Sequence, residues 1–282
     1  MKIAITGATG FIGRHVRNAL AKTDHDVVLV ARSVERVGEK LAREEIIVAD
    51  LNESRSDWFE IFLKPDAVLH LAWGGLPNYL DSYHVEIELP MQSRFLTALI
   101  DSGLKKLVVT GTCYEYGMSS GALSEDQETN PNTPYGIAKD SLRKELFELQ
   151  QSKDFDLTWA RIFYPYGEGQ SEHSLYSQIG NCAKSGIKEF KIYNGESKLD
   201  FVPVEGVASS LLKLLAQRGI GLINIGSAKP RLVVNFAQEL VTANEWDMSL
   251  LIVQKGDRSY EAKEFWADIS KMQSIENIRC FD

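Results

Sequence analysis

The sequence contains little that would suggest export, a membrane or a metal site. Its 282 residues include only three cysteines, Cys113, Cys182 and Cys280, and their spacing matches neither a zinc site nor a disulfide framework. No apolar run approaches the roughly 18 residues that span a bilayer. No signal peptide precedes the first expected strand. We therefore expect a cytoplasmic protein with no membrane segment and no metal.

Basic residues are also scarce relative to acidic ones. The chain has 31 Lys and Arg against 39 Asp and Glu, a net charge of −8. Because nucleic acid binding needs a basic surface, we expect no nucleic acid partner. The 44% hydrophobic and 25% charged residues are ordinary for a globular protein. The length allows one large α/β domain, or a domain with a smaller lobe.

Over the first 166 residues, short apolar runs alternate with longer amphipathic ones. Strands are expected over residues 3–5, 27–30, 45–48, 66–71, 107–109 and 157–162. Helices are expected over residues 11–21, 34–42, 57–63, 80–101 and 135–151. Strands that alternate with helices predict right-handed βαβ units, and therefore an α/β fold with a Rossmann-type, doubly wound parallel sheet.

After residue 166 the elements become shorter. Helices are expected near residues 175–184, 204–216 and 233–243, and strands near residues 190–193 and 221–225. No Pro-rich or Ser-rich linker precedes them. We expect a dinucleotide-binding Rossmann domain with the catalytic residues over 1–166, and a smaller C-terminal α/β substrate lobe over 167–282. The chain is expected to cross between the two near residues 200–230.

Residues 6–13, TGATGFIG, lie between the first expected strand and the first helix. Gly7 permits a tight turn, Gly10 lets the backbone approach a pyrophosphate, and Gly13 lets the helix pack against the sheet. The start of a helix also offers unpaired N–H groups to phosphates. The loop therefore predicts a dinucleotide site, with these residues binding the cofactor: Gly7, Thr9, Gly10, Phe11, Ile12 and Gly13.

The end of the second strand bears on the choice between NAD and NADP. NAD sites usually carry an acidic residue there for the ribose 2′-hydroxyl. This chain instead has Ala31, Arg32 and Ser33. A guanidinium and a hydroxyl suit a 2′-phosphate, so NADP(H) is favoured over NAD(H). The alternative is that Arg32 only covers a loop.

Tyr135 and Lys139 lie one helical turn apart at the start of a helix. A lysine ammonium beside a phenol is expected to lower the pKa of Tyr135 and make it a usable acid or base. Thr112 follows a strand at the sheet edge where α/β proteins bind ligands, within reach of a substrate oxygen. The alternative is an ordinary surface pair on a helix.

Together with residues 161–169, RIFYPYGEG, residues 200–208, DFVPVEGVA, and residues 265–271, FWADISK, these motifs resemble the extended short-chain dehydrogenase/reductases that act on nucleotide sugars, the NAD-dependent epimerase/dehydratase family. The resemblance covers nearly the whole chain. It implies that Tyr135 is the acid/base, that Lys139 binds the nicotinamide ribose, and that Thr112 is the catalytic hydroxyl.

The same resemblance implies further contacts with cofactor and substrate. Asp50 and Leu51 match the pair that contacts adenine, and Leu71 and Ala72 match the loop over the cofactor phosphates and ribose. The substrate-binding candidates are Trp73, Thr112, Cys113, Tyr114, Tyr164, Arg231 and Arg258, the two arginines for the diphosphate. The aromatic residues Trp73, Tyr114, Tyr164 and Tyr166 are expected near the site, where they would pack against a sugar methyl group and the nucleobase, or else only pack within their loops.

The two residues that follow Thr112 help to predict which reaction the protein catalyses. Dehydratases of the family carry Asp-Glu there, whereas this chain has Cys113 and Tyr114, with Glu115 one place too late. Residues 111–117, GTCYEYG, resemble those of dTDP-sugar 4-ketoreductases that form 6-deoxytalose or fucose. We expect NAD(P)H-dependent reduction of the 4-keto group of a dTDP-linked 4-keto-6-deoxyhexose, in deoxysugar and O-antigen polysaccharide biosynthesis.

Two other functions remain open. One is a nucleotide-sugar 4-epimerase with tightly bound NAD, and the other is a non-catalytic NADP-binding regulator. A homodimer is also expected, because family members commonly pair two helices. Leu142, Leu146 and Leu149, with residues 96–100, would form its face or else pack on the chain's own sheet.

Overall fold

The computed structural model describes residues 1–187, 189–256 and 259–277. A seven-stranded sheet in the order β12-β7-β5-β4-β1-β2-β3 forms its centre, and every pair in it is parallel. The strands are β1 (Lys2–Thr6), β2 (Asp26–Ala31), β3 (Glu44–Val48), β4 (Ala67–His70), β5 (Lys106–Thr112), β7 (Asp156–Ile162) and β12 (Gly221–Ile225). The predicted doubly wound α/β fold is confirmed.

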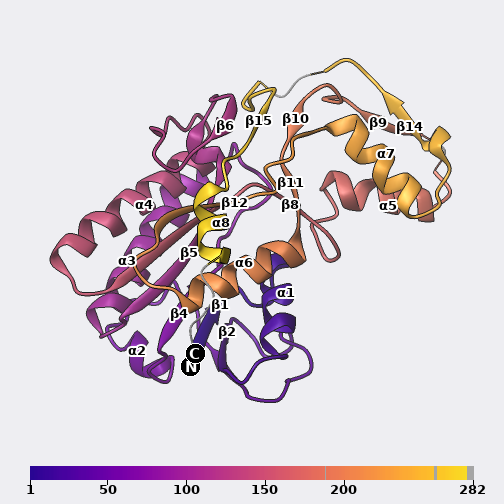
Figure 1. The fold of residues 1–282 in the computed structure, drawn as a ribbon. Coiled ribbons are helices and arrows are strands. Elements are labelled where there is room, and N and C mark those ends of the chain that lie inside the picture. Colours follow the sequence, from indigo (N-terminus) through magenta and orange to yellow (C-terminus); the bar gives the residue numbers. More distant parts are fainter. Residues whose placement is uncertain (188, 257–258, 278–282) are drawn as a thin grey trace.

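Helices cover both faces of this sheet (Figure 1). One face packs on α1 (Phe11–Leu20), α6 (Val204–Ala216) and α8 (Ser270–Asn277). The other packs on α2 (Trp58–Ile61), α3 (Leu89–Asp101) and α4 (Pro134–Ser152). Because both faces are covered, the central strands are apolar on both sides, and no residue from Ile3 to Ile5 is exposed.

The helix expected over residues 34–42 is absent, and this prediction is wrong. The segment between β2 and β3 is a series of turns instead. The Arg17 guanidinium of α1 donates to the backbone oxygens of Val37, at 2.7 Å, and of Glu39. It also pairs with Glu44 at 2.6 Å. Gly38 adopts a positive φ of 71°. A side chain from another element therefore holds this segment in a non-helical path.

The long helix expected over residues 80–101 begins later than predicted. A π-helical turn, η1 (His84–Glu88), precedes α3. Pro90 stands at the start of α3 and has no N–H to donate to the preceding turn, which accounts for the change of helix type at this point.

The second half of the chain forms α5 (Leu175–Lys184), α7 (Val233–Ala243) and η3 (Met248–Leu250), joined by short two-stranded ladders. The ladders pair β8 (Tyr164–Tyr166) with β11 (Phe201–Pro203), β9 (Phe190–Ile192) with β14 (Leu251–Val253), β10 (Lys198–Leu199) with β13 (Arg231–Leu232), and β6 (Gly121–Leu123) with β15 (Phe265–Ala267). However, α6 and β12 belong to the central sheet and its cover. A single cut after residue 166 therefore does not separate the two parts.

Leu142 and Leu146, which were candidates for a dimer face, are buried in the core cluster between the sheet and its helices, together with Leu96 and Leu99. These side chains therefore pack on the chain's own sheet, which was the alternative to a dimer face.

Within the described ranges, no helix is long and apolar enough to cross a membrane.

Asp200 joins the smaller lobe to the sheet and is fully buried. One carboxylate oxygen accepts the Ser227 backbone N–H at 2.7 Å and the Ser227 hydroxyl. The other accepts the backbone N–H groups of Ala228, at 3.1 Å, and Ala267, at 3.0 Å. Three separate chain segments thus meet at one side chain that accepts on both oxygens.

We predict that Asp200→Asn lowers the free energy of unfolding by about 2–4 kcal/mol, because the new amide N–H₂ opposes backbone N–H groups that then lack an acceptor. Urea denaturation measures the change. Ser227→Ala, which removes only the hydroxyl donor, is the control and is expected to cost about 1 kcal/mol or less. Equal stability of the Asn variant and the wild type would contradict this reading.

Candidate active site

A cavity of about 740 Å³ opens at the carboxyl edge of the sheet, between the sheet and the smaller lobe. Thirteen of the residues predicted for the site line it: Gly7, Gly10, Phe11, Ile12, Gly13, Leu71, Trp73, Thr112, Cys113, Tyr114, Tyr135, Lys139 and Tyr164. The cavity therefore brings together the glycine loop, the Tyr-Lys pair and the aromatic residues expected around the substrate.

The glycine loop is packed too tightly for larger residues. Gly7 has a φ of 73°, and a Cβ there would lie 2.7 Å from the backbone nitrogen of Ala72. A Cβ on Gly13 would lie 2.2 Å from the carbonyl oxygen of Gly7. No side chain caps the N-terminus of α1 at Gly10, and no acidic residue lies in its first turn. The loop thus presents free N–H groups and a positive helix end, which fit the pyrophosphate of a dinucleotide.

The start of α4 sets the position of Tyr135. Thr133 caps the helix by accepting the backbone N–H of Gly136 at 3.1 Å, and Pro134 occupies its first turn. Tyr135 and Lys139 then lie one turn apart, and both are buried. The Lys139 ammonium donates to the backbone oxygen of Thr110 at 2.8 Å and lies 3.9 Å from the centre of the Trp73 ring.

Burial governs the ionisation of both residues. It lowers the pKa of Lys139 to about 7, although the carboxylates of Glu115 and Glu88 oppose the shift. It raises the pKa of Tyr135, a shift that a hydrogen bond from Thr112 only partly offsets. The expectation of a lowered pKa for Tyr135 is therefore wrong for this arrangement, because loss of solvation sets the direction and the nearby Tyr79, Glu115 and Cys113 add to it.

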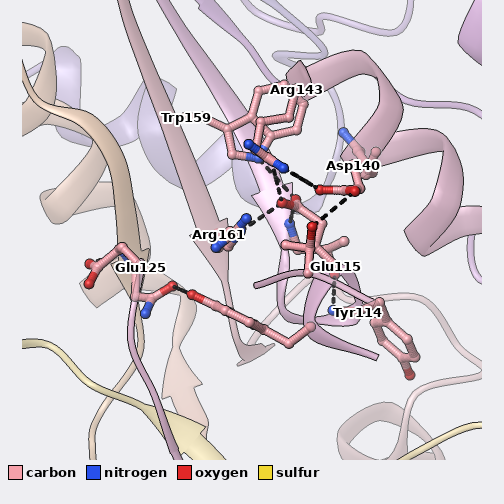
Figure 2. Close-up of polar contacts among 12 residues, drawn as sticks. Tyr114, Glu115, Glu125, Asp140, Arg143, Trp159 and Arg161 are labelled. Atoms are coloured by element: carbon pink, nitrogen blue, oxygen red, sulfur yellow. Dashed lines mark hydrogen bonds and ion pairs between the residues drawn. The ribbon is translucent and has the colours of Figure 1, made fainter. Parts of the chain in front are cut away.

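Glu115 follows Thr112 by three residues and is fully buried. Figure 2 shows its carboxylate among Trp159, Arg161 and Arg143. One of its oxygens accepts the backbone N–H of Thr112 and the indole N–H of Trp159, both at 2.9 Å. The other pairs with Arg161 at 2.7 Å and lies 3.7 Å from Arg143. The carboxylate faces away from the cavity and fixes the backbone of Thr112, so it is not placed to remove a substrate proton as a dehydratase residue would.

Other predicted residues lie outside the cavity lining. Arg32 and Ser33 are on the turn segment after β2, and Asp50 instead accepts the backbone N–H of Asn52 at 3.0 Å. Arg231 pairs with Glu239 at 2.6 Å. The remaining residues in this group are Thr9, Leu51 and Ala72, the last of which backs Gly7. Arg258 falls outside the described residues.

Several lining residues were not predicted from the sequence. They are aromatic and come from segments far apart in the chain: Tyr79, Tyr176, Phe201, Phe236 and Tyr260. Tyr166, which was expected near the substrate, also lines the cavity. Glu261, which accepts hydrogen bonds from the predicted residues Tyr114 and Tyr164, was also missed. Apart from Phe201, which lies in the motif of residues 200–208, no motif marks the unpredicted lining residues, because only the folded chain brings them to the cavity.

The arrangement of the cavity agrees with the family that the sequence matches. The sequence model of the NAD dependent epimerase/dehydratase family matches residues 3–226, most of the chain. The chain belongs to this family. It is therefore an enzyme of the extended short-chain dehydrogenase/reductase type that acts on nucleotide sugars, and the predicted resemblance is confirmed.

Known members of the family match over nearly the full length. A dTDP-6-deoxy-L-talose 4-dehydrogenase (NAD(+)) from Aggregatibacter actinomycetemcomitans is 27% identical, over 94% of this chain and 99% of that protein. An uncharacterized UDP-glucose epimerase, YtcB, from Bacillus subtilis is 24% identical over 98% and 92%. The solved structure of MoeE5 with UDP-glucuronic acid and NAD superposes with a TM-score of 0.83 at 24% identity, covering 98% of this chain and 92% of that one.

The expected preference for NADP is wrong. The dehydrogenase relative is named for NAD(+), and the MoeE5 structure contains NAD. The turn segment after β2 offers a reason. The pKa of the Glu35 carboxyl is lowered by its own backbone N–H and by a hydrogen bond from Ser33. A carboxylate beside Ser33 disfavours a 2′-phosphate at that place.

We predict that Gly13→Ala weakens NAD binding by at least about tenfold, because its Cβ must displace the backbone of the glycine loop. Titration of the purified protein with NAD, followed by calorimetry, measures this. Gly206→Ala in α6 is the matched control, because a Cβ there meets its nearest atom at 3.9 Å. Unchanged affinity in the Gly13 variant would show that the loop does not bind the cofactor.

We predict that Lys139→Met makes the protein more stable than wild type near pH 6. Between about pH 7 and 10.5 the unfolded chain keeps a proton on Lys139 that the folded chain releases, so this residue's contribution to stability rises with pH across that window. The difference in stability between variant and wild type is thus largest at and below pH 7 and narrows towards pH 10. Thermal melts across this pH range test it, and a gap that grows with pH would refute it.

Proposed function

We propose that the chain interconverts the 4-hydroxyl and 4-keto forms of a dTDP-linked 6-deoxyhexose, with NAD(H) as the redox partner and reduction of the ketone as its working direction. The full-length similarity to the dTDP-6-deoxy-L-talose 4-dehydrogenase carries this proposal, since it spans 94% of this chain and 99% of that protein. The cavity chemistry supports it.

Tyr135 is proposed as the residue that protonates the forming alkoxide. Burial keeps the proton on this phenol, since its pKa is raised, and this suits donation in the reductive direction. Thr112, which hydrogen-bonds Tyr135, would polarise the carbonyl oxygen at the same point. Glu115 supports this step from behind, because its hydrogen bond to the Thr112 backbone fixes where that hydroxyl stands.

The cofactor, when bound, supplies or accepts the hydride. The glycine loop would hold its pyrophosphate through Gly7, Gly10 and the start of α1, where no side chain occupies the N–H groups. Lys139 would bind the nicotinamide ribose hydroxyls, since it lies on the same helix face as Tyr135 and lines the same cavity. Its contacts with Thr110 and Trp73 hold the ammonium in place.

The aromatic wall suits a deoxysugar. Trp73, Tyr79, Tyr114 and Tyr164 line the cavity around Tyr135, with the Trp73 ring 6.0 Å and the Tyr79 ring 5.5 Å from its ring centre. A 6-deoxyhexose carries a methyl group at C6, which such rings can cover.

We predict that the protein oxidises NADH when given a dTDP-4-keto-6-deoxyhexose, and reduces NAD⁺ when given the corresponding dTDP-6-deoxyhexose. Nicotinamide absorbance follows both directions. Tyr135→Phe is expected to lower turnover by at least about 100-fold while NAD affinity stays within about twofold, because the phenol oxygen transfers the proton and the ring keeps its packing.

The same assay separates the other functions. A 4-epimerase would interconvert two sugar epimers with no net change in NADH and would retain NAD through purification. A regulator would bind the cofactor and change neither sugar nor nicotinamide. Either result would replace the dehydrogenase proposal.

A further inference from the structure

Behind the aromatic wall of the cavity lies a carboxylate that the proposed reaction does not use. Glu261 stands between β14 and β15, is 6% exposed, and does not line the cavity. Tyr114 and Tyr164, which do line the cavity, both direct their hydroxyl groups towards the Glu261 carboxylate. Its segment is anchored nearby, where Gly121 donates its backbone N–H to the Glu264 oxygen at 3.0 Å.

The hydrogen bonds have a fixed direction. The Tyr114 hydroxyl donates to the carboxylate oxygen of Glu261 at 3.0 Å, and the Tyr164 hydroxyl donates to the same oxygen. A phenol has one proton to donate. With both protons committed to Glu261, the two phenol oxygens have only lone pairs left for any other partner, so each can accept a further hydrogen bond but cannot donate one.

This pair of acceptors lies beside the reacting groups. Tyr114 is two residues after Thr112, and its ring centre is 6.1 Å from that of Tyr135. The Tyr114 ring is held between two others, stacked on Tyr79 at 4.9 Å and on Tyr260 at 6.5 Å. It therefore has little freedom to turn its hydroxyl elsewhere.

We propose that Glu261 is a positioning residue that sets sugar specificity: by holding Tyr114 and Tyr164 as acceptors, it selects a hexose that presents a hydroxyl donor on C3, the carbon next to the reacting C4. The inference rests on the proposed function. In a 6-deoxyhexose, C5 carries the C6 methyl group and no hydroxyl, so the C3 hydroxyl is the donor adjacent to the reacting C4. If the C3 group of a sugar can only accept hydrogen bonds, it faces the lone pairs of both phenol oxygens, and binding of that sugar is disfavoured.

The test compares a dTDP-6-deoxyhexose with its 3-deoxy-3-fluoro analogue, whose fluorine cannot donate. The measured quantity is the ratio of the two kcat/KM values for NAD⁺ reduction. Wild type is expected to favour the hydroxyl sugar by about 10- to 100-fold. In Glu261→Leu both phenols regain a free proton, and the ratio is expected to fall at least fivefold. The electronic effect of fluorine on hydride transfer is common to both proteins and cancels between them.

Glu264→Gln is the matched control, because Glu264 lies three residues further on and pairs with Lys198 at the surface. It is expected to keep the wild-type ratio. Tyr164→Phe, a second variant that leaves Glu261 in place, removes one acceptor and is also expected to lower the ratio. Tyr164→Phe is used as the test if Glu261→Leu does not fold, as judged by NAD binding and thermal melting.

A wild-type ratio near one, or an unchanged ratio in both Glu261→Leu and Tyr164→Phe, overturns the inference and leaves the proposed function standing. If wild type turns over neither sugar, the proposed function itself fails. The two failures are therefore distinguishable in one set of rates.

Discussion

A fully buried carboxylate, that of Glu115, joins the elements that carry the catalytic candidates. It binds the backbone of Thr112 at the end of β5, the side chains of Trp159 and Arg161 on β7, and approaches Arg143 on α4. An ionised group without solvent is tolerated only where several donors surround it. Those donors come from two adjacent strands and a helix, so the carboxylate is satisfied only when all three are in register.

The same lack of solvent gives the site its chemistry. Tyr135 and Lys139 would be a neutral phenol and a full cation on an exposed helix. In the folded chain the lysine has a pKa of about 7 and the tyrosine holds its proton more firmly. Both changes come first from desolvation, and in Lys139 the neighbouring carboxylates oppose the change. The depth of α4 in the protein, more than the four-residue spacing, decides how readily each group gains or loses a proton.

Features that depend only on residues close together in the sequence could be predicted from the sequence. The glycine loop, the apolar strands, and the limits of α5, α6, α7 and β12 follow from periodicity and turn residues, and the structure places them as expected. Features that depend on distant partners could not. Arg17 overrides the helical pattern of the segment after β2, and Glu261 meets Tyr114 across 147 positions of sequence. The cofactor preference failed for a different reason, since Glu35 lies only two positions after Ser33 in the sequence and its carboxylate was not weighed against Arg32.

The interleaving of the lobe with the sheet has a consequence for motion. The chain leaves the sheet after β7, returns through α6 and β12, leaves again for α7, and comes back at β15 and α8, with Asp200 fastening these passages together. Rotation of one lobe against the other about a single hinge would have to bend several covalent connections at once. Any movement between lobe and sheet must therefore be shared among these connections, and it has to keep or break the hydrogen bonds of Asp200 as a set.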